Sequence, residues 1–225
     1  MAFDGSTVNC IKRELTKELT GARLNKIAQP EPDELLLTFK TAGGLRRLLI
    51  SANASLPLIY LTDKNKPGPA TAPNFCMLLR KHIQNGRLIN ISQPSLERIL
   101  IFEIEHMDEM GDLKRKKMIV ELMGKHSNII FTDEDGIIID SIKHVNSAVS
   151  SVREVLPGRD YFIPNTLNKL DPFAVTEDEL YAALREKAMP TGRAIYSVLT
   201  GFSPVISEEL CYRAGADPAI PPSDL

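Results

Sequence analysis

The first apolar pattern along the chain is helical. Hydrophobic residues recur every three or four positions from Val8 to Leu19, which predicts an amphipathic helix. Asp4 or Ser6 can cap its start, and Gly21, which tolerates a positive φ, ends it. A second helical pattern covers residues 74–84.

The rest of the first 172 residues follows the pattern of short strands separated by turn-forming residues. Gly43-Gly44 is typical of a tight hairpin, and the polar residues 133–136 separate the last two strands. So many short strands with only two helices predict an α+β fold, an antiparallel β-sandwich-like domain with flanking helices. The predicted strands cover residues 24–29, 35–41, 45–51, 58–61, 87–93, 98–106, 116–123, 128–132 and 137–141.

A change in composition marks the last part of the chain. Proline and glycine gather between residues 156 and 173, as is typical of a connector. Residues 1–172 carry 23 basic and 21 acidic side chains, whereas residues 173–225 carry 4 and 8. We therefore place a domain boundary near residue 173, between a domain of residues 1–172 and a small all-α domain of residues 173–225. In the latter, two short helices flank a turn at residues 200–203, which matches a helix-hairpin-helix pattern.

The overall composition is that of an ordinary globular protein. The net charge is −2, so no global field attracts nucleic acid. Cys10, Cys76 and Cys211 are isolated, which suits a reducing compartment. The chain has no signal-peptide pattern and no apolar run long enough to span a membrane, so we expect a cytoplasmic protein with no membrane partner.

Motifs for catalysis and metal binding are missing from the sequence. There is no G-x-S-x-G elbow, no phosphate-binding glycine loop and no histidine or cysteine pair at metal-ligand spacing. Glu103 and Glu105 share one face of a predicted strand, where acid–base chemistry or a plain solvated face is possible, and the solvated face is favoured. We expect no catalytic residues, no metal and no cofactor.

Residues suited to binding nucleic acid are better represented. The run Lys114 to Lys117 holds four cations in or beside a turn, where either a solvated hairpin tip or phosphate binding would account for it. Other side chains could also contact phosphate or RNA. They are Arg80, Lys81, Arg87, Lys125, His126, Ser127 and Asn128.

Two short segments allow both a structural and a binding interpretation. Residues 121–128 follow a predicted strand and crowd glycine, lysine, histidine, serine and asparagine together, as a hydrogen-bonded turn or an RNA-contacting corner would. Glu97-Arg98 opens a predicted strand, either as a surface ion pair or as a charged pair offered to RNA.

The motifs together resemble the NFACT-N domain, over nearly all of residues 1–172 and in order. They are FDG at residues 3–5, GARLNKIAQP at 21–30, FCMLLRKHIQNG at 75–86, ELMGKHSNII at 121–130, DSIKHV at 140–145 and REVLPGRDY at 153–161. The remainder is similar to the helix-hairpin-helix domain that follows NFACT-N in the bacterial RqcH, or fibronectin-binding protein A-like, family of ribosome quality control factors. Because family members continue into a coiled coil and an NFACT-R domain, we expect the chain to be an N-terminal fragment.

The resemblance implies a function that composition does not. Family members bind tRNA and the large ribosomal subunit with a stalled nascent chain, and the bacterial ones recruit alanyl-tRNA to support untemplated alanine tails. The family's Asp-Arg pair and Glu-hydrophobic-Met triplet, which engage tRNA, match Glu97-Arg98 and Glu121-Leu122-Met123, with glutamate in place of aspartate.

The resemblance also bears on two other functions. The family fold is similar to the N-terminal domain of formamidopyrimidine-type DNA glycosylases, but Ala2-Phe3 stands where those enzymes need a proline nucleophile and a glutamate, so glycosylase chemistry is not expected. A fibronectin-binding surface adhesin is the alternative suggested by the older family name, and the lack of an export signal counts against it.

Overall fold

The computed structural model describes residues 3–164 and 168–224, so Ala2 lies outside the described residues. The chain forms two compact units. One comprises Phe3 with residues 10–92 and 99–164, and the other comprises residues 4–9, 93–98 and 168–224. The boundary that we predicted near residue 173 stays a prediction, because the second unit also takes in two short segments of the N-terminal half.

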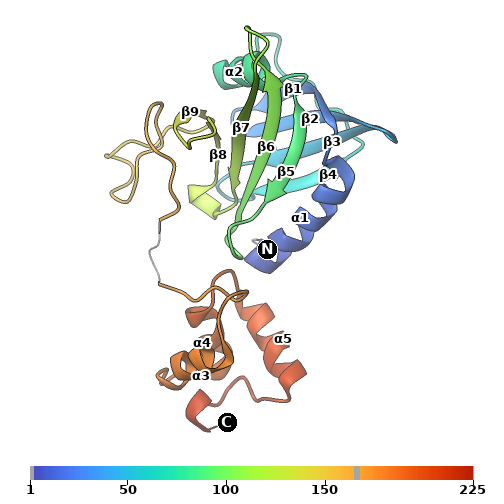
Figure 1. Cartoon of the computed structure of the whole chain (residues 1–225). Helices are drawn as coiled ribbons and strands as arrows, with labels where there is room; N and C mark the ends of the chain where they lie inside the picture. Colours follow the sequence, from blue (N-terminus) through green and yellow to red (C-terminus); the bar gives the residue numbers. More distant parts are fainter. Residues whose placement is uncertain (1–2, 165–167, 225) are drawn as a thin grey trace. The chain divides into compact units, whose positions relative to one another are not determined.

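The first unit is built on a curved antiparallel sheet (Figure 1). The strands form one sheet in the order β4-β3-β2-β1-β5-β6-β7-β8-β9, which confirms the antiparallel α+β fold but replaces the expected sandwich of two sheets with one continuous sheet. The strands are β1 (Arg23–Glu31), β2 (Glu34–Thr41), β3 (Gly44–Ser51), β4 (Leu58–Thr62), β5 (Arg87–Ser92), β6 (Ile99–Met107), β7 (Leu113–Glu121), β8 (Asn128–Thr132) and β9 (Ile138–Ser141).

The sheet consists of two meanders joined at a narrow seam. Strands β1 to β4 form the first meander and β5 to β9 the second, and each strand pairs with its neighbour in sequence. Between β1 and β5 the ladder consists of the pair Arg23↔Arg87, and backbone hydrogen bonds between residues 21–24 and 85–88 flank this pair. Both strands leave regular register directly after this pair, at the irregularities between Leu24 and Lys26 and between Leu88 and Asn90.

Two helices complete the apolar core of this unit. Helix α1 (Gly5–Leu19) contributes its first turn to the second unit and buries Leu15 and Leu19 in the first. Helix α2 (Asn74–Ile83) buries Phe75 and Leu79 and packs against β1 and β6. The aromatic side chains of Phe39, Phe102 and Phe131, from β2, β6 and β8, are fully buried.

A second apolar cluster lies on β6 to β9, where residues 145–163 pack against the sheet. Its buried members are Ile99, Ile119, Ile130, Ile138 and Val155, and Met123, Val145, Tyr161 and Ile163 are among the partly buried side chains that pack on it. Backbone hydrogen bonds between Val145 and Val155 in both directions close this segment into a loop. The cluster fixes the end of β7, where the candidate site begins.

The second unit is mainly helical. It contains α3 (Glu177–Arg185), α4 (Thr191–Val198), α5 (Pro204–Ala214) and the short 3₁₀ helix η2 (Pro222–Asp224). Thr176 and Glu179 form a capping box at the start of α3. Between α4 and α5 the chain turns at Gly201 with φ of +79°, and the Ser203 side chain caps α5. Helices α4 and α5 and the glycine turn between them confirm the two short helices that we predicted on either side of residues 200–203.

Two predicted strand boundaries need correction. Strand β6 begins at Ile99, so Glu97 and Arg98 lie in the preceding loop. Strand β7 begins at Leu113, so the cations at residues 114–117, expected in or beside a turn, all lie within the strand that directly follows the turn. The early start of β7 results from a tight turn between β6 and β7. In this turn the Asp108 carboxylate accepts hydrogen bonds from the backbone N–H groups of Met110 and Asp112, so that pairing extends to Met107↔Leu113.

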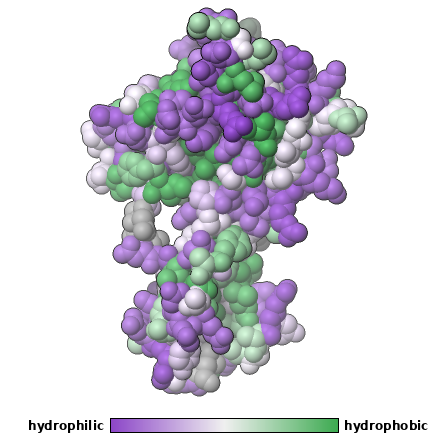
Figure 2. Space-filling view, viewed as in Figure 1, coloured by the Kyte–Doolittle hydropathy of each residue, from purple (hydrophilic) through white to green (hydrophobic). Residues whose placement is uncertain are grey.

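Among the described residues, no helix is both long and apolar enough to cross a membrane. On the face shown in Figure 2, hydrophobic side chains appear in patches between hydrophilic ones.

Candidate nucleic-acid interface

The segment that follows β7 is a tight corner. Gly124 has φ of +58° and opens the 3₁₀ turn η1 (Gly124–His126). The Ser127 hydroxyl accepts a hydrogen bond from the N–H of Met123 (2.8 Å), and the N–H of Ser127 donates to the Gly124 carbonyl (2.9 Å). The hydrogen-bonded-turn interpretation of residues 121–128 is thus correct for its backbone and for Ser127.

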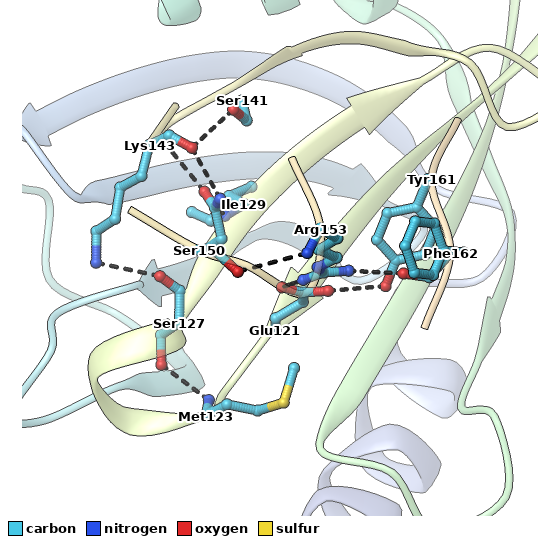
Figure 3. Close-up of polar contacts among 11 residues, drawn as sticks. Glu121, Met123, Ser127, Ile129, Ser141, Lys143, Ser150, Arg153, Tyr161 and Phe162 are labelled. Atoms are coloured by element: carbon cyan, nitrogen blue, oxygen red, sulfur yellow. Dashed lines mark hydrogen bonds and ion pairs between the residues drawn. The ribbon is translucent and has the colours of Figure 1, made fainter. Parts of the chain in front are cut away.

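Lys143 ties the corner to neighbouring segments of the chain (Figure 3). Its ammonium donates to the carbonyl of Ser127 (3.1 Å) and to that of Ala52. The Asn128 side chain donates to the Lys143 carbonyl (2.8 Å) and accepts from the Lys143 N–H (3.1 Å). Three separate chain segments therefore meet at one lysine, and the turn is locked to the sheet.

Glu121 is the last residue of β7 and lies where the corner begins. Its side chain is completely buried, and its carboxylate accepts hydrogen bonds from the Arg153 guanidinium and from the Tyr161 hydroxyl (2.9 Å; Figure 3). Burial and the Glu121 carboxylate raise the pKa of Tyr161 well above its ordinary value. Burial opposes the charge of Arg153, but the Glu121 carboxylate and Tyr161 together outweigh it and raise the pKa of Arg153. Arg153 also stacks over the Tyr161 ring and donates to the Phe162 carbonyl (2.8 Å).

These contacts narrow the predicted binding residues of the corner. Glu121, Leu122, Ser127 and Asn128 are buried, so their side chains shape the corner and do not face solvent. The accessible side chains are those of Lys125 and His126, which are exposed, and Met123, which is partly exposed. Their contact with RNA stays a prediction.

Glu97 and Arg98 belong to the second unit. Both side chains are partly exposed. The Arg98 guanidinium makes no hydrogen bond or ion pair with any residue in the described ranges. The charges of Glu97 and Arg98 both act on Lys169. Burial lowers the pKa of Lys169, the Glu97 carboxylate opposes this shift, and the Arg98 guanidinium adds to it. Its ammonium donates to the Tyr196 carbonyl (2.6 Å). Two cations, Arg98 and Lys169, therefore lie near one carboxylate, that of Glu97.

The cations around α2 play different parts. Arg80 is partly buried, and its Nε donates to the Ile27 carbonyl (2.9 Å), which ties α2 to β1. Lys81 and Arg87 are exposed and remain candidates for phosphate contacts. His82 lies against the ring of Phe131, with 6.0 Å between centroids.

The paired carboxylates on β6 belong to a solvated, charge-paired face. Glu103 lies opposite Lys117, and Glu105 lies opposite Arg115 with an ion pair of 3.7 Å. Within the described ranges, no group of three or more histidine, cysteine or acidic side chains could hold a metal ion.

Four residues of these two sites were missing from the predicted set: Lys143, Arg153, Tyr161 and Lys169. Three of them do lie in the segments DSIKHV and REVLPGRDY that carried the family resemblance. The contacts of Lys143 with Ser127 and of Arg153 and Tyr161 with Glu121 join positions 16 to 40 apart, and that of Lys143 with Ala52 joins positions 91 apart, so spacing alone gave no signal of them.

Comparison with known proteins identifies close relatives. Residues 4–225 match the family model described as NFACT N-terminal and middle domains, which confirms the resemblance seen in the sequence. The Rqc2 homolog RqcH of Bacillus subtilis is 38% identical over 216 residues, covering 96% of this chain and 38% of that protein. The chain thus spans about two fifths of the length of such a relative.

Solved structures show the same fold. The N-terminal domain of the fibronectin-binding protein PavA from Streptococcus pneumoniae is 33% identical, with a TM-score of 0.86 over 95% of this chain and 80% of that one. The N-terminal part of the fibronectin/fibrinogen-binding protein from Streptococcus suis is 33% identical, with a TM-score of 0.88 over 96% and 81%.

Proposed function

Because the chain belongs to the NFACT N-terminal and middle domain family, we propose that it is the tRNA- and ribosome-binding part of a ribosome quality control factor. The name of its Bacillus relative supports this role, and the accessible cations of the two candidate sites suit a polyanionic partner. The proposed role is binding, with no catalysis by this part.

The observation that carries the proposal is the state of Arg98. A partly buried guanidinium normally finds a carboxylate or carbonyl, as Arg153 does. Arg98 has no such partner among residues 3–164 and 168–224. A phosphate or a base edge of tRNA would supply the missing acceptors, and Lys169 would add a second positive charge.

The corner at residues 121–128 would contribute differently. Met123, Lys125 and His126 would contact tRNA, while Glu121 and Leu122 would act by holding the turn in shape. This division predicts that substitutions at Lys125 weaken binding without unfolding, whereas substitutions at Glu121 act through stability.

A gel shift with deacylated tRNA tests the proposal. Arg98→Ala should weaken binding about tenfold, the scale of one lost charge-assisted bidentate contact, and leave the melting temperature unchanged. Arg213→Ala is the matched control, because Arg213 is in the same unit and its guanidinium pairs with Glu209 on the surface. Equal binding by the two variants would remove Arg98 from the site.

The finer functions follow from the family. In the cytoplasm, the complete factor would recruit alanyl-tRNA to large ribosomal subunits with stalled chains and support untemplated alanine tailing. The glycine turn between α4 and α5 would form a helix-hairpin-helix module, and the N-terminal fold would be related to that of formamidopyrimidine-type glycosylases. Cryo-electron microscopy of the full-length factor bound to 50S particles would test the partner and the placement of both candidate sites.

A fibronectin-binding role is the second candidate, because two similar solved structures carry names of fibronectin-binding proteins. The two roles differ in where the protein must lie. Surface biotinylation of intact cells would label an adhesin, whereas a ribosome-bound factor would be protected until lysis and would sediment with large subunits.

A further inference from the structure

Three cations lie side by side across the seam of the sheet. Arg23 on β1 pairs with Lys40 on β2 on one side and with Arg87 on β5 on the other. Residues directly opposite each other in antiparallel strands point to the same face, with Cβ atoms about 5 Å apart. All three side chains are exposed. They form a cationic row, Lys40-Arg23-Arg87, across three strands.

Placing like charges opposite each other destabilises a sheet. Further along the sheet this cost is avoided, because Glu105 pairs with Arg115 and Glu103 lies opposite Lys117. In the cationic row, none of the three cations has an ion pair with any carboxylate of the described residues. The Nε of Arg23 donates to the Asn85 carbonyl (3.2 Å), which fixes this guanidinium while its terminal nitrogens stay without a described partner. Glu105 lies opposite Arg87 on β6 and offsets part of this repulsion, whereas both ladder neighbours of Arg23 are cations, so a like-charge repulsion centred on Arg23 remains.

We propose that the cationic row binds the phosphate backbone of RNA, as a second contact surface beside the tRNA sites. This inference rests on the proposed RNA-binding function and adds a surface to it. Three charges within about 10 Å lie inside one Debye length at physiological salt, so they act together on one stretch of polyanion. Exposed ammonium and guanidinium groups on a sheet face contact phosphates and carry no base-reading geometry, so the binding is independent of sequence.

The cationic row is separate from the corner at residues 121–128. Arg87 lies opposite Glu105, whereas Glu121 lies opposite Ile99 at the other end of β6. Six residues of strand separate Ile99 from Glu105, which is about 20 Å. One RNA phosphate group therefore cannot touch both, and the two surfaces can be tested independently.

A triple variant tests the proposal: Arg23→Gln, Lys40→Gln and Arg87→Gln in the chain described here. The probe is a fluorescent single-stranded RNA of mixed sequence, titrated between 50 and 200 mM salt. Loss of three phosphate contacts should weaken binding at 50 mM salt about tenfold or more and make the slope of log K against log salt shallower by about 2. The melting temperature should stay equal or rise, because the repulsion is gone.

The control removes the same charge elsewhere: Lys12→Gln, Arg13→Gln and Lys17→Gln on α1. Equal weakening by both triple variants would mean that net charge alone binds RNA, and unchanged binding by the row variant would also overturn the proposal. Loss of poly-glutamate binding with RNA binding intact would assign the row to an acidic protein instead. If Arg98→Ala weakens tRNA binding while the row variant binds normally, the row fails and the proposed function stands.

Discussion

The guanidinium of Arg153 donates to the buried carboxylate of Glu121, across 32 positions of sequence. This pair joins the loop at residues 145–163 to the end of β7. A charge buried without its partner is costly, so Arg153→Met should lower the free energy of unfolding by about 3–5 kcal/mol. Urea denaturation measures the change. Arg159→Met, which removes an exposed pair with Glu154, should cost less than about 1 kcal/mol. Similar losses of unfolding free energy in the two variants would show that the buried Glu121–Arg153 pair stabilises the chain no more than an exposed ion pair does.

Hydrogen bonds through Asp4 and Ser203 link the start of α1 to the start of α5, and they make part of the stability of the fold depend on the charge of Asp4. The Asp4 carboxylate accepts from the Thr7 N–H (2.7 Å) and from the Ser203 hydroxyl (2.6 Å), and Ser203 in turn caps α5. Burial opposes ionisation of Asp4, but these hydrogen bonds outweigh it and hold the pKa of Asp4 below its usual value of 3.8. The stabilisation is therefore complete above about pH 4 and is lost as the pH falls through the lower, folded-state pKa.

Asp4→Asn keeps a helix cap but removes this charge. We expect a loss of about 1 kcal/mol at pH 7 and a smaller loss of stability between pH 4 and pH 2 than in the unaltered chain. Thermal unfolding followed by circular dichroism across this range measures both. A variant with the same acid sensitivity as the unaltered chain would contradict the assignment.

Gly201 is required by close packing as well as by its positive φ. A Cβ at this position would lie 2.0 Å from the Leu96 carbonyl oxygen, with φ at +79°. Gly201→Ala should therefore cost about 3 kcal/mol or more. Gly215 has φ of +68° but open space around it, so Gly215→Ala isolates the backbone strain, about 1 kcal/mol. Chemical denaturation of the two variants gives the difference, and equal losses would mean that Leu96 moves aside freely.

His82 and His106 should make the first unit less stable in mild acid. Burial, with the neighbouring charges of Lys116 and Lys81, lowers the pKa of His82 below 6.5, and burial also lowers that of His106. The unfolded chain then binds more protons than the folded one, so stability falls as the pH drops below about 6.5. The double variant His82→Gln, His106→Gln should have a flatter stability profile between pH 7 and pH 5. An unchanged slope in the double variant would contradict this assignment to His82 and His106.

The sequence predicted local structure well, because each element carries its own pattern. The strands and helices lie close to their predicted ranges, and the Gly43-Gly44 hairpin is present, with Thr41↔Gly44 as its last pair. Asp4 proved to be the cap of α1, as one of two predicted options. Hydrophobic periodicity and turn chemistry suffice for such features.

Long-range contacts lay beyond the reach of such patterns. Nothing in the spacing of Glu121, Arg153 and Tyr161 shows that they share one buried network, whereas the role of Glu121 in tRNA binding came from the family resemblance and stays a prediction. The single joint at Arg23↔Arg87 was equally hidden, because strand runs look the same in one sheet or in two. The start of β7 at Leu113, three residues before the predicted start, was also missed, because charged residues at the end of a strand carry no apolar pattern.

The single joint between the two meanders also bears on how the chain acquires its structure. Every ladder partner of β2, β3 and β4 lies between residues 23 and 62, so half of the sheet can assemble on a nascent chain before β5 is translated. Local pairing of this kind favours fast folding. Four backbone hydrogen bonds link residues 21–24 to residues 85–88, so these amide protons should become protected from exchange only after β5 has formed, later than those in the middle of β2 and β3.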